Sequence, residues 1–513
     1  MPVALTGTYR SRTRYHSRNR TIAVRPGHDP PWRRRISVST AGAGERSQPY
    51  AKMVLTLMTA RMLPNHRATL VLSSCALIAM SCRDSQPAPR PQETVQRADT
   101  AQPVAKDAAP RPIADGRPAG PPPRITQLVL ADRHTCALTE VGTVRCWGKG
   151  DNGRLGHSNT ASIGDNEPVW TAGDVPLGGP ATQLAAGSRH TCALMREKGA
   201  VRCWGGNQHG QLGYAHRDDI GDNETPASAG DIQLGGSAVQ LAAGGSITCV
   251  VLDSGLVRCW GYGREGGLGR GKMPDLNIGD DEHPATNPTL DIGVRVTGLA
   301  LTRNAGCALL ESSDVRCWGY QPGRPDSVQR KPSEVGDVRI GAPVQRLSAS
   351  GSITCALLTS AGVRCFGEHG KAALGYPGRD TVGLDDDLAG LGDIEVGGQV
   401  VDLGVGANHV CAVLRGGSVR CWGANSTGQL GRGDKLMIGD DETPASAPSV
   451  DVGGPVSHIA AGGSATCALL ESGGVRCWGY NRDGQLGYGH TDTIGDDETP
   501  ASVGDVALFA TTQ

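Results

Sequence analysis

The sequence has few aromatic residues and no apolar run that comfortably spans a bilayer. Phe occurs only 2 times in 513 residues, and aromatic residues make up 4% of the chain. The clearest apolar run, residues 68–80, falls short of the roughly 20 residues that a transmembrane helix needs. The 74 Gly and 32 Pro instead favour many short strands joined by tight turns over a helical bundle. We therefore expect an all-β protein.

The sequence also lacks the residue groupings on which catalysis or metal binding usually rests. It contains no CxxC cluster and no histidine pair. His134, His190 and His409 recur at one repeat position, but Ile or Ala stands there in other repeats. The most irregular loop, residues 384–387, is interpreted as a degenerate form of an acidic loop described below. We expect neither a catalytic residue nor enzyme activity.

Charge is divided unevenly along the chain. Residues 1–82 carry 13 Lys and Arg against 2 Asp and Glu, which leaves 37 against 49 in the rest. The near-zero total therefore hides a basic head and an acidic body. An acidic body repels phosphate backbones, so we expect no nucleic-acid partner.

The Arg-rich residues 1–52 show neither apolar periodicity nor a plausible core. They are expected to be a disordered leader or a stretch that precedes the true start of translation. An export signal belongs at the start of a chain. The candidate starts are Met53, Met58 and Met62.

Residues 53–82 have the layout of a bacterial lipoprotein signal, with a basic segment, an apolar run and a small residue before Cys82. Cys82 is the expected lipidation site, because a cut at Cys75 would leave too short an apolar core. Residues 83–124 are rich in Pro and Ala and predict an extended linker. We expect an exported protein of the cell envelope or cell surface, held to the membrane by a lipid anchor alone.

The rest of the chain, residues 125–513, repeats one unit seven times. Each unit contains a cysteine pair, and the first members lie 56, 57, 58, 48, 56 and 56 residues apart. A complete unit has four strand-length segments separated by turn residues, which predicts a seven-bladed β-propeller with four-stranded blades. The pairs are Cys136 with Cys146, Cys192 with Cys203, Cys249 with Cys259, Cys307 with Cys317, Cys355 with Cys365, Cys411 with Cys421, and Cys467 with Cys477.

The two ends of the repeat region indicate how the propeller closes. The first unit begins at Ile125 without the Gly-Asp-Val-x-Leu segment that precedes the other units, and the chain ends with such a segment at residues 504–508. We expect this C-terminal segment to add a strand to the first blade and to close the ring.

Several motifs in these units resemble the repeats of the regulator of chromosome condensation (RCC1-like) family. They are His-Thr-Cys-Ala-Leu, Val-Arg-Cys-Trp-Gly, Gly-Gln-Leu-Gly and Gly-Asp-Val-x-Leu. The fifth unit has Phe366 in place of Trp, and the fourth departs most, in residues 321–335. The resemblance implies a propeller that binds other proteins. Recurrence of the Trp at one blade position favours packing between blades.

Each cysteine pair flanks a short hairpin turn, as Cys136 and Cys146 do. Symmetric pairing places such residues opposite one another, within disulfide reach, and an exported chain meets oxidising conditions. We therefore predict seven disulfides within blades. The alternatives are cysteines serving as small buried apolar residues and, after that, metal binding.

An acidic loop of the form Ile-Gly-Asp-(Asn or Asp)-Glu occurs in five units and would fall on one propeller face. Asp and Asn commonly shape turns, so turn formation is the first interpretation. Binding of Ca²⁺ or of a basic partner is the alternative, although EF-hand spacing is absent. The candidate residues are Asp165, Glu167, Asp222, Glu224, Asp280, Asp281, Asp440, Asp441, Asp496 and Asp497.

Three functions compete on this evidence. We expect a monomeric scaffold that binds a protein partner, with inhibition of that partner as a special case and with no required cofactor. A guanine-nucleotide exchange factor for a small GTPase is one alternative, yet no repeat exceeds 58 residues and none has room for an inserted wedge. A Ca²⁺-dependent adhesion module is the other alternative.

Overall fold

The computed structural model describes residues 121–271, 276–322, 325–368 and 372–510, all within the second of two compact units, residues 104–513. The predicted leader, the signal segment with Cys82 and nearly all of the linker lie outside the described residues. Among the residues that are described, no helix has the length and apolar character needed to cross a membrane.

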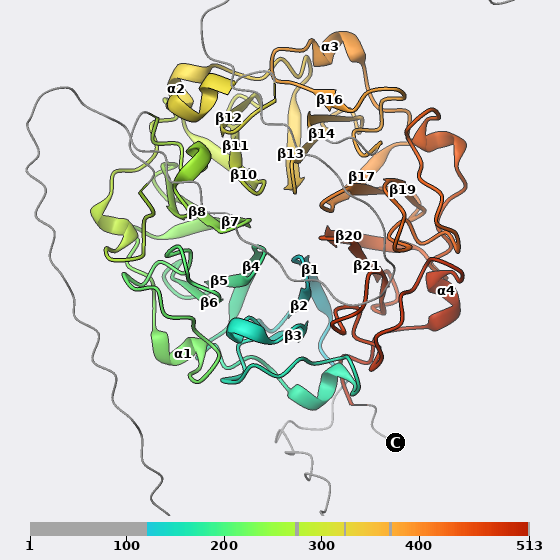
Figure 1. Ribbon diagram of the computed structural model, residues 1–513, viewed down its shortest axis with the longest axis horizontal. Helices are drawn as coiled ribbons and strands as arrows, with labels where there is room; N and C mark the ends of the chain where they lie inside the picture. Colours follow the sequence, from blue (N-terminus) through green and yellow to red (C-terminus); the bar gives the residue numbers. More distant parts are fainter. Residues whose placement is uncertain (1–120, 272–275, 323–324, 369–371, 511–513) are drawn as a thin grey trace, which may run out of the picture. The chain divides into compact units, whose positions relative to one another are not determined.

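The described residues form seven antiparallel sheets that follow one another around a common centre (Figure 1). The first four are β1 (Ile125–Leu130), β2 (His134–Thr139), β3 (Val144–Gly148); β4 (Ala181–Ala186), β5 (His190–Met195), β6 (Val201–Gly205); β7 (Ala238–Gly244), β8 (Ile247–Leu252), β9 (Val257–Gly261); and β10 (Val296–Leu301), β11 (Ala305–Leu310), β12 (Val315–Gly319). The last three are β13 (Val344–Ser350), β14 (Ile353–Leu358), β15 (Val363–Glu368), β16 (Thr381–Val382); β17 (Val400–Val405), β18 (His409–Leu414), β19 (Val419–Gly423); and β20 (Val456–Gly462), β21 (Ala465–Leu470), β22 (Val475–Gly479).

Short helical turns occupy the connections between sheets. The α-helical turns are α1 (Pro226–Ala229), α2 (Pro332–Val335), α3 (Leu388–Leu391) and α4 (Pro500–Val503). The 3₁₀ turns are η1 (Asp151–Gly153), η2 (Val169–Ala172), η3 (Arg264–Gly266), η4 (Pro284–Thr286), η5 (Pro325–Gln329) and η6 (Pro444–Ser446).

The middle strand of every sheet is buried along its whole length, as β2 and β5 show. Neighbouring sheets cover both of its faces, so its sequence is nearly continuous in apolar and small residues rather than alternating. The innermost strands of all seven sheets line a space of about 320 Å³. Strand β20 of the last sheet contacts β1 of the first, so these two sheets are neighbours.

The prediction of four-stranded blades is wrong for six of the seven sheets, which have three strands. The expected fourth segment pairs only once: the amide of Val175 donates to the carbonyl of Val144 at 2.7 Å. Two residues later the amide of Leu177 donates back to the carbonyl of Val175 at 2.9 Å, which is a γ-turn. The γ-turn bends the backbone off the sheet, so the ladder ends there. In the fifth sheet the fourth strand, β16, comes from a different segment.

The prediction that the C-terminal segment adds a strand to the first sheet is also wrong. The amide of Val506 donates to the carbonyl of Val475 at 2.8 Å, within the last sheet. Each sheet takes this segment from the chain that follows its own third strand, so the first sheet lacks nothing. The first and last sheets are joined by a side chain instead, because Arg145 donates to the carbonyl of Leu508 and lies 4.5 Å over the ring of Phe509.

Tryptophan side chains join six of the seven sheets to the one before, and the fifth sheet has Phe366 at this position. Trp204 is fully buried, and its indole N–H donates to the carbonyl of Arg154 in the preceding unit at 3.0 Å. Trp147 does the same with Gln485 of the last unit at 2.9 Å. A Cβ on Gly487, which has a φ of +82°, would lie 2.8 Å from the Trp147 nitrogen, so glycine is required beside the ring. The Trp side chains thus pack between neighbouring blades, as predicted.

Polar side chains join the innermost strands, and they do so in two ways. Gln127 donates to the carbonyl of Leu184 at 3.0 Å and accepts from its amide at 2.8 Å. Gln183 makes the same pair of bonds to Leu241 in the next sheet. These neutral joints hold the first three sheets together without charge.

A charged joint replaces the glutamines in the last three sheets. Asp402 on β17 is 4% exposed and accepts from the amide of Ile459 at 2.8 Å. Its carboxylate also pairs with His458 at 2.6 Å and with Arg346. Burial favours a higher pKa for Asp402, but His458, Arg346 and the Ile459 amide together hold it well below the ordinary range.

Candidate functional site

The fourteen repeat cysteines are joined in the seven pairs expected from the hairpin pattern. The disulfides join Cys136 to Cys146, Cys192 to Cys203, Cys249 to Cys259, Cys307 to Cys317, Cys355 to Cys365, Cys411 to Cys421, and Cys467 to Cys477. Each bond links the second and third strands of one sheet, with Cα atoms 4.0–4.1 Å apart. The two members of each pair lie directly opposite one another in the ladder and are buried. The disulfides therefore staple individual sheets and do not cross between them.

Antiparallel pairing gives every sheet two different ends. The turn from the first to the second strand and the long segment after the third strand lie at one end, which we call the loop end. The short turn between the second and third strands lies at the other, which we call the hairpin end. The acidic-loop residue Ile163 pairs with Gly148 at the close of β3, and Ile220, Ile278, Ile438 and Ile494 repeat this arrangement. All five acidic loops therefore lie at the loop end.

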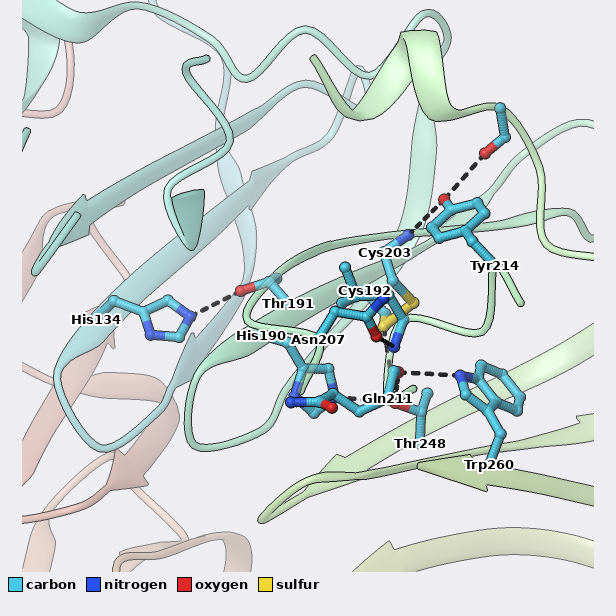
Figure 2. The surroundings of a disulfide bond; sticks show 12 residues. His134, His190, Thr191, Cys192, Cys203, Asn207, Gln211, Tyr214, Thr248 and Trp260 are labelled. Atoms are coloured by element: carbon cyan, nitrogen blue, oxygen red, sulfur yellow. Dashed lines mark hydrogen bonds between the residues drawn. A yellow bond between two sulfur atoms is a disulfide. The ribbon is translucent and has the colours of Figure 1, made fainter. Parts of the chain in front are cut away.

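The recurring histidines lie beneath the loop end and bind threonines of the next sheet (Figure 2). His190 Nε2 is 2.9 Å from Thr248 Oγ1, and the Thr248 hydroxyl lies 2.9 Å from the carbonyl of Gln211. Trp260 donates to the same carbonyl at 3.0 Å. Because the hydroxyl donates its one proton to Gln211, the proton shared with the imidazole comes from Nε2 of His190.

These histidines are buried and each one joins two neighbouring sheets. Burial lowers the pKa of His190 to about 4 and that of His409 to about 3. His134, which is 2.7 Å from Thr191, has its pKa lowered by burial and then by the nearby Arg154. Three separate joints use the three imidazoles, so they do not converge on one ion.

The acidic loops pack each unit against its neighbour. The amide of Gly489 in the last unit donates to the carbonyl of Gly164 in the first at 3.1 Å, and Ala215 makes the same bond to Gly279 at 3.1 Å. A Cβ on Gly484 would come within 2.4 Å of the Asp165 amide nitrogen, which shows how closely the two turns approach. The loops thus have a structural role as turns.

The acidic side chains form compact clusters in three of the five loops. In each cluster carboxylate oxygens come within 4.8 Å of one another. The clusters are Asp280 with Asp281 and Glu282, Asp440 with Asp441 and Glu442, and Asp496 with Asp497 and Glu498. The other two loops have Asn between Asp165 and Glu167 and between Asp222 and Glu224.

Basic side chains already balance part of this charge. Arg217 pairs with Asp280 at 2.6 Å, and Lys435 pairs with Asp496 at 3.0 Å. Burial, followed by the adjacent Asp165 carboxylate, raises the pKa of Glu167. Binding of Ca²⁺ by these loops stays a prediction.

A groove of about 1110 Å³ lies at the loop end over the second and third sheets. Arg189 and Arg303 line it from turns between first and second strands, and Arg264 lines it from η3. Asp281 and Glu282 of the third acidic loop line another part of it. We call this hollow the groove.

An aromatic pair lies in the groove among charged groups. The rings of His209 and Tyr262 have centroids 4.8 Å apart and are inclined by 57°. Burial, then the positive charge of Arg217, lowers the pKa of His209, with Arg264 and Arg189 acting in the same direction and Asp280 opposing them. The neutral form of the imidazole is therefore favoured.

The groove was not among the sites predicted from the sequence. Asp281 of its acidic wall was among the candidate residues, but the arginines were not, because they recur too rarely to form a pattern: Arg133 matches Arg189 in one other unit, Arg482 matches Arg264 in one other unit, and Arg303 has no match. A signal was nevertheless present, since Ser246 and Ser352 occupy the position of Arg189 in other units. Departures from a repeat, rather than the repeat, indicate this surface.

The fold and its joints define a disulfide-stapled propeller of seven repeated sheets, and comparison with known sequences identifies the repeats. A model of the regulator of chromosome condensation (RCC1) repeat matches residues 125–154, 181–211, 238–266, 400–429 and 456–485. A second model of the same repeat matches residues 142–194 and 416–469. The chain therefore carries RCC1 repeats.

Known relatives share the repeats at modest identity. The ultraviolet-B receptor UVR8 of Arabidopsis thaliana is 25% identical over 72% of this chain and 68% of its own length. The E3 ubiquitin-protein ligase HERC2 of Homo sapiens is 27% identical over 66% of this chain, which spans only 6% of that protein. The solved structure of yeast RCC1 (Prp20) bound to Kap60 superimposes with a TM-score of 0.54 at 18% identity, over 73% of this chain and 84% of the yeast chain. This last likeness shows the fold.

Proposed function

We propose that the protein is an exported binding scaffold whose loop end receives a protein partner. The observation that carries the proposal is the groove, which combines open volume, charged residues that differ between most units and an aromatic pair. The recurring Trp, His and Gln residues join neighbouring sheets, and the recurring Cys residues join strands within a sheet. Loop-end residues that differ between units do not form these joints, so they are available for recognition.

Seven disulfides support export, because such bonds persist in oxidising compartments and are rare in the cytosol. We further propose a lipid anchor on Cys82, which would display the propeller from a membrane. The intact mass of protein from its native host, alkylated before and after reduction, tests both points. A lipid adduct on Cys82 and fourteen thiols that appear only after reduction are expected. An unmodified chain with free thiols would contradict export.

Site-specific photo-crosslinking in the native host tests which end binds. A benzophenone amino acid at Gln208, an exposed residue of the groove, is compared with one at Val141, a 50% exposed residue of the hairpin end. We expect a protein adduct from position 208 and none from position 141. Adducts from position 141 alone, or from neither position, would contradict the proposal.

Guanine-nucleotide exchange, the other role implied by the resemblance, has no specific observation in its favour among the described residues. Protein binding is common to both roles, and the crosslinked partner would distinguish them. A small GTPase in the adduct would favour exchange over the scaffold role.

A further inference from the structure

Three arginines of the groove have unpaired side chains within the described parts of the chain. Arg189, Arg264 and Arg303 are exposed, and within the described parts of the chain their side chains have no hydrogen-bond or ion-pair partner. The framework arginines behave differently: Arg202, for example, pairs with Asp231 at 2.7 Å and donates to the carbonyl of Leu177. An arginine kept without a partner at a groove wall retains its full donor set for a ligand.

The charges of the groove are sorted by position. Arg217 is neutralised by Asp280, and Arg270 donates to Asn287 at 2.6 Å. The three unpaired arginines come from the second, third and fourth units, whereas Asp281 and Glu282 come from one acidic loop and Asp132 comes from the first unit. A uniformly anionic ligand, such as a sulfated polysaccharide, would meet repulsion from that loop. A ligand with a few carboxylates and neutral neighbours would not.

The remaining lining suits a polypeptide. Asn304 offers an amide group that can bond to a peptide backbone, and Tyr262 with His209 offers ring surface for side chains. Arginine binds a carboxylate through two parallel N–H···O bonds, which adds geometric selectivity to charge.

We propose that the groove binds an acidic segment of the partner protein, with Asp or Glu carboxylates of that segment held by Arg189, Arg264 and Arg303. This inference rests on the proposed scaffold function and names the chemistry of its partner. The acidic loop that also lines the groove limits the negative charge that the segment can carry, so selectivity depends on the placement of carboxylates as well as on their number.

Fluorescence anisotropy with the full chain tests the assignment. The probe is fluorescein-labelled Gly-Ser-Asp-Asp-Ser-Gly, and the matched peptide has Asn in place of both Asp residues. We expect R189Q/R264Q/R303Q to weaken binding of the Asp peptide by about ten-fold, because each exposed contact between a peptide carboxylate and an arginine contributes a fraction of a kcal/mol. The control R196Q/R339Q/R415Q removes the same charge from exposed positions near the hairpin end and should leave binding unchanged.

Three results would overturn the assignment: equal binding of the Asp and Asn peptides, loss in the control as large as in the groove variant, or tighter binding of a sulfated tetrasaccharide than of the Asp peptide. Photo-crosslinking from Gln208 in the R189Q/R264Q/R303Q background separates this inference from the scaffold role. An adduct that persists in this variant would support the scaffold function and contradict the binding of an acidic segment by these arginines. Loss of the adduct, with wild-type crosslinking intact, would support both.

Discussion

The innermost strands are joined by neutral side chains in the first three sheets and by charged ones in the last three. Gln127 and Gln183 each make two bonds to the backbone of the next strand. Asp402 makes one such bond and depends on Arg346 and His458 for the rest. The same joint can thus be built with or without charge, but only the charged version makes its strength depend on pH and on the integrity of its partners.

Removing the centre of the charged joint should have the largest effect. Asp402→Ala leaves the Ile459 amide unpaired and two basic side chains without their carboxylate, so we expect a loss of about 3 kcal/mol in the free energy of unfolding. Gln183→Ala, the matched neutral change, should cost about 1–2 kcal/mol. Urea denaturation at pH 7 measures both. Equal losses would remove the distinction between the joints.

The buried histidines should make the neutral framework sensitive to acid. Their pKa values are lowered in the folded protein, to about 4 for His190 and about 3 for His409, so the unfolded chain takes up protons first as the pH falls below 6.5. The contribution of these neutral histidines to the free energy of unfolding is complete above pH 6.5. It falls by on the order of 2 kcal/mol for each histidine as the pH falls toward 4. Urea denaturation at pH 7, 5.5 and 4 should show a shallower decline in H134A/H190A/H409A than in wild type. Parallel declines would contradict this.

Converting the charged joint to the neutral kind should change the free energy of unfolding little at pH 7. R346Q/D402Q/H458Q is expected to lie within about 1 kcal/mol of wild type there. Because the pKa of Asp402 is lowered in the folded state, its stabilisation is present above its ordinary value of 3.8 and is lost as the pH falls below it. The free energy of unfolding of the variant, relative to that of wild type, should therefore be higher at pH 3 than at pH 7. If the variant is less stable relative to wild type at pH 3 than at pH 7, the ionised Asp402 carboxylate does not supply the stabilisation of this joint.

Calcium should have the smallest effect, because the acidic loops already act as turns with part of their charge balanced. We expect addition of chelator to shift the melting temperature by less than about 1 °C, whereas a site with micromolar affinity would shift it by several degrees in millimolar Ca²⁺. The double variant D440N/D441N provides the control for any shift that is seen. Loss of a measured shift in that variant would establish the alternative of Ca²⁺ binding.

Features that repeat could be predicted from the sequence, and features of geometry or of single units could not. The cysteine pairs and the Trp positions recur, so their hairpins and packing follow from spacing. The fourth strand was over-predicted because Val175–Leu177 has the composition of a strand, and only its backbone bond shows the γ-turn. Arg346, Asp402 and His458 look like ordinary polar residues of separate strands, and nothing in the sequence brings them together. The groove arginines are inconspicuous for the same reason.

The disulfide pattern has a consequence for how the chain acquires its bonds. Every one of the seven pairs joins cysteines that are consecutive along the repeat region and only 10 or 11 residues apart. A chain that crosses a membrane from its N-terminus would offer these thiols to an oxidant in the order in which they pair. Linking each newly emerged thiol to the one just before it, two at a time, gives native connectivity throughout, so vectorial export could oxidise the propeller without the thiol exchange that corrects mispaired bonds.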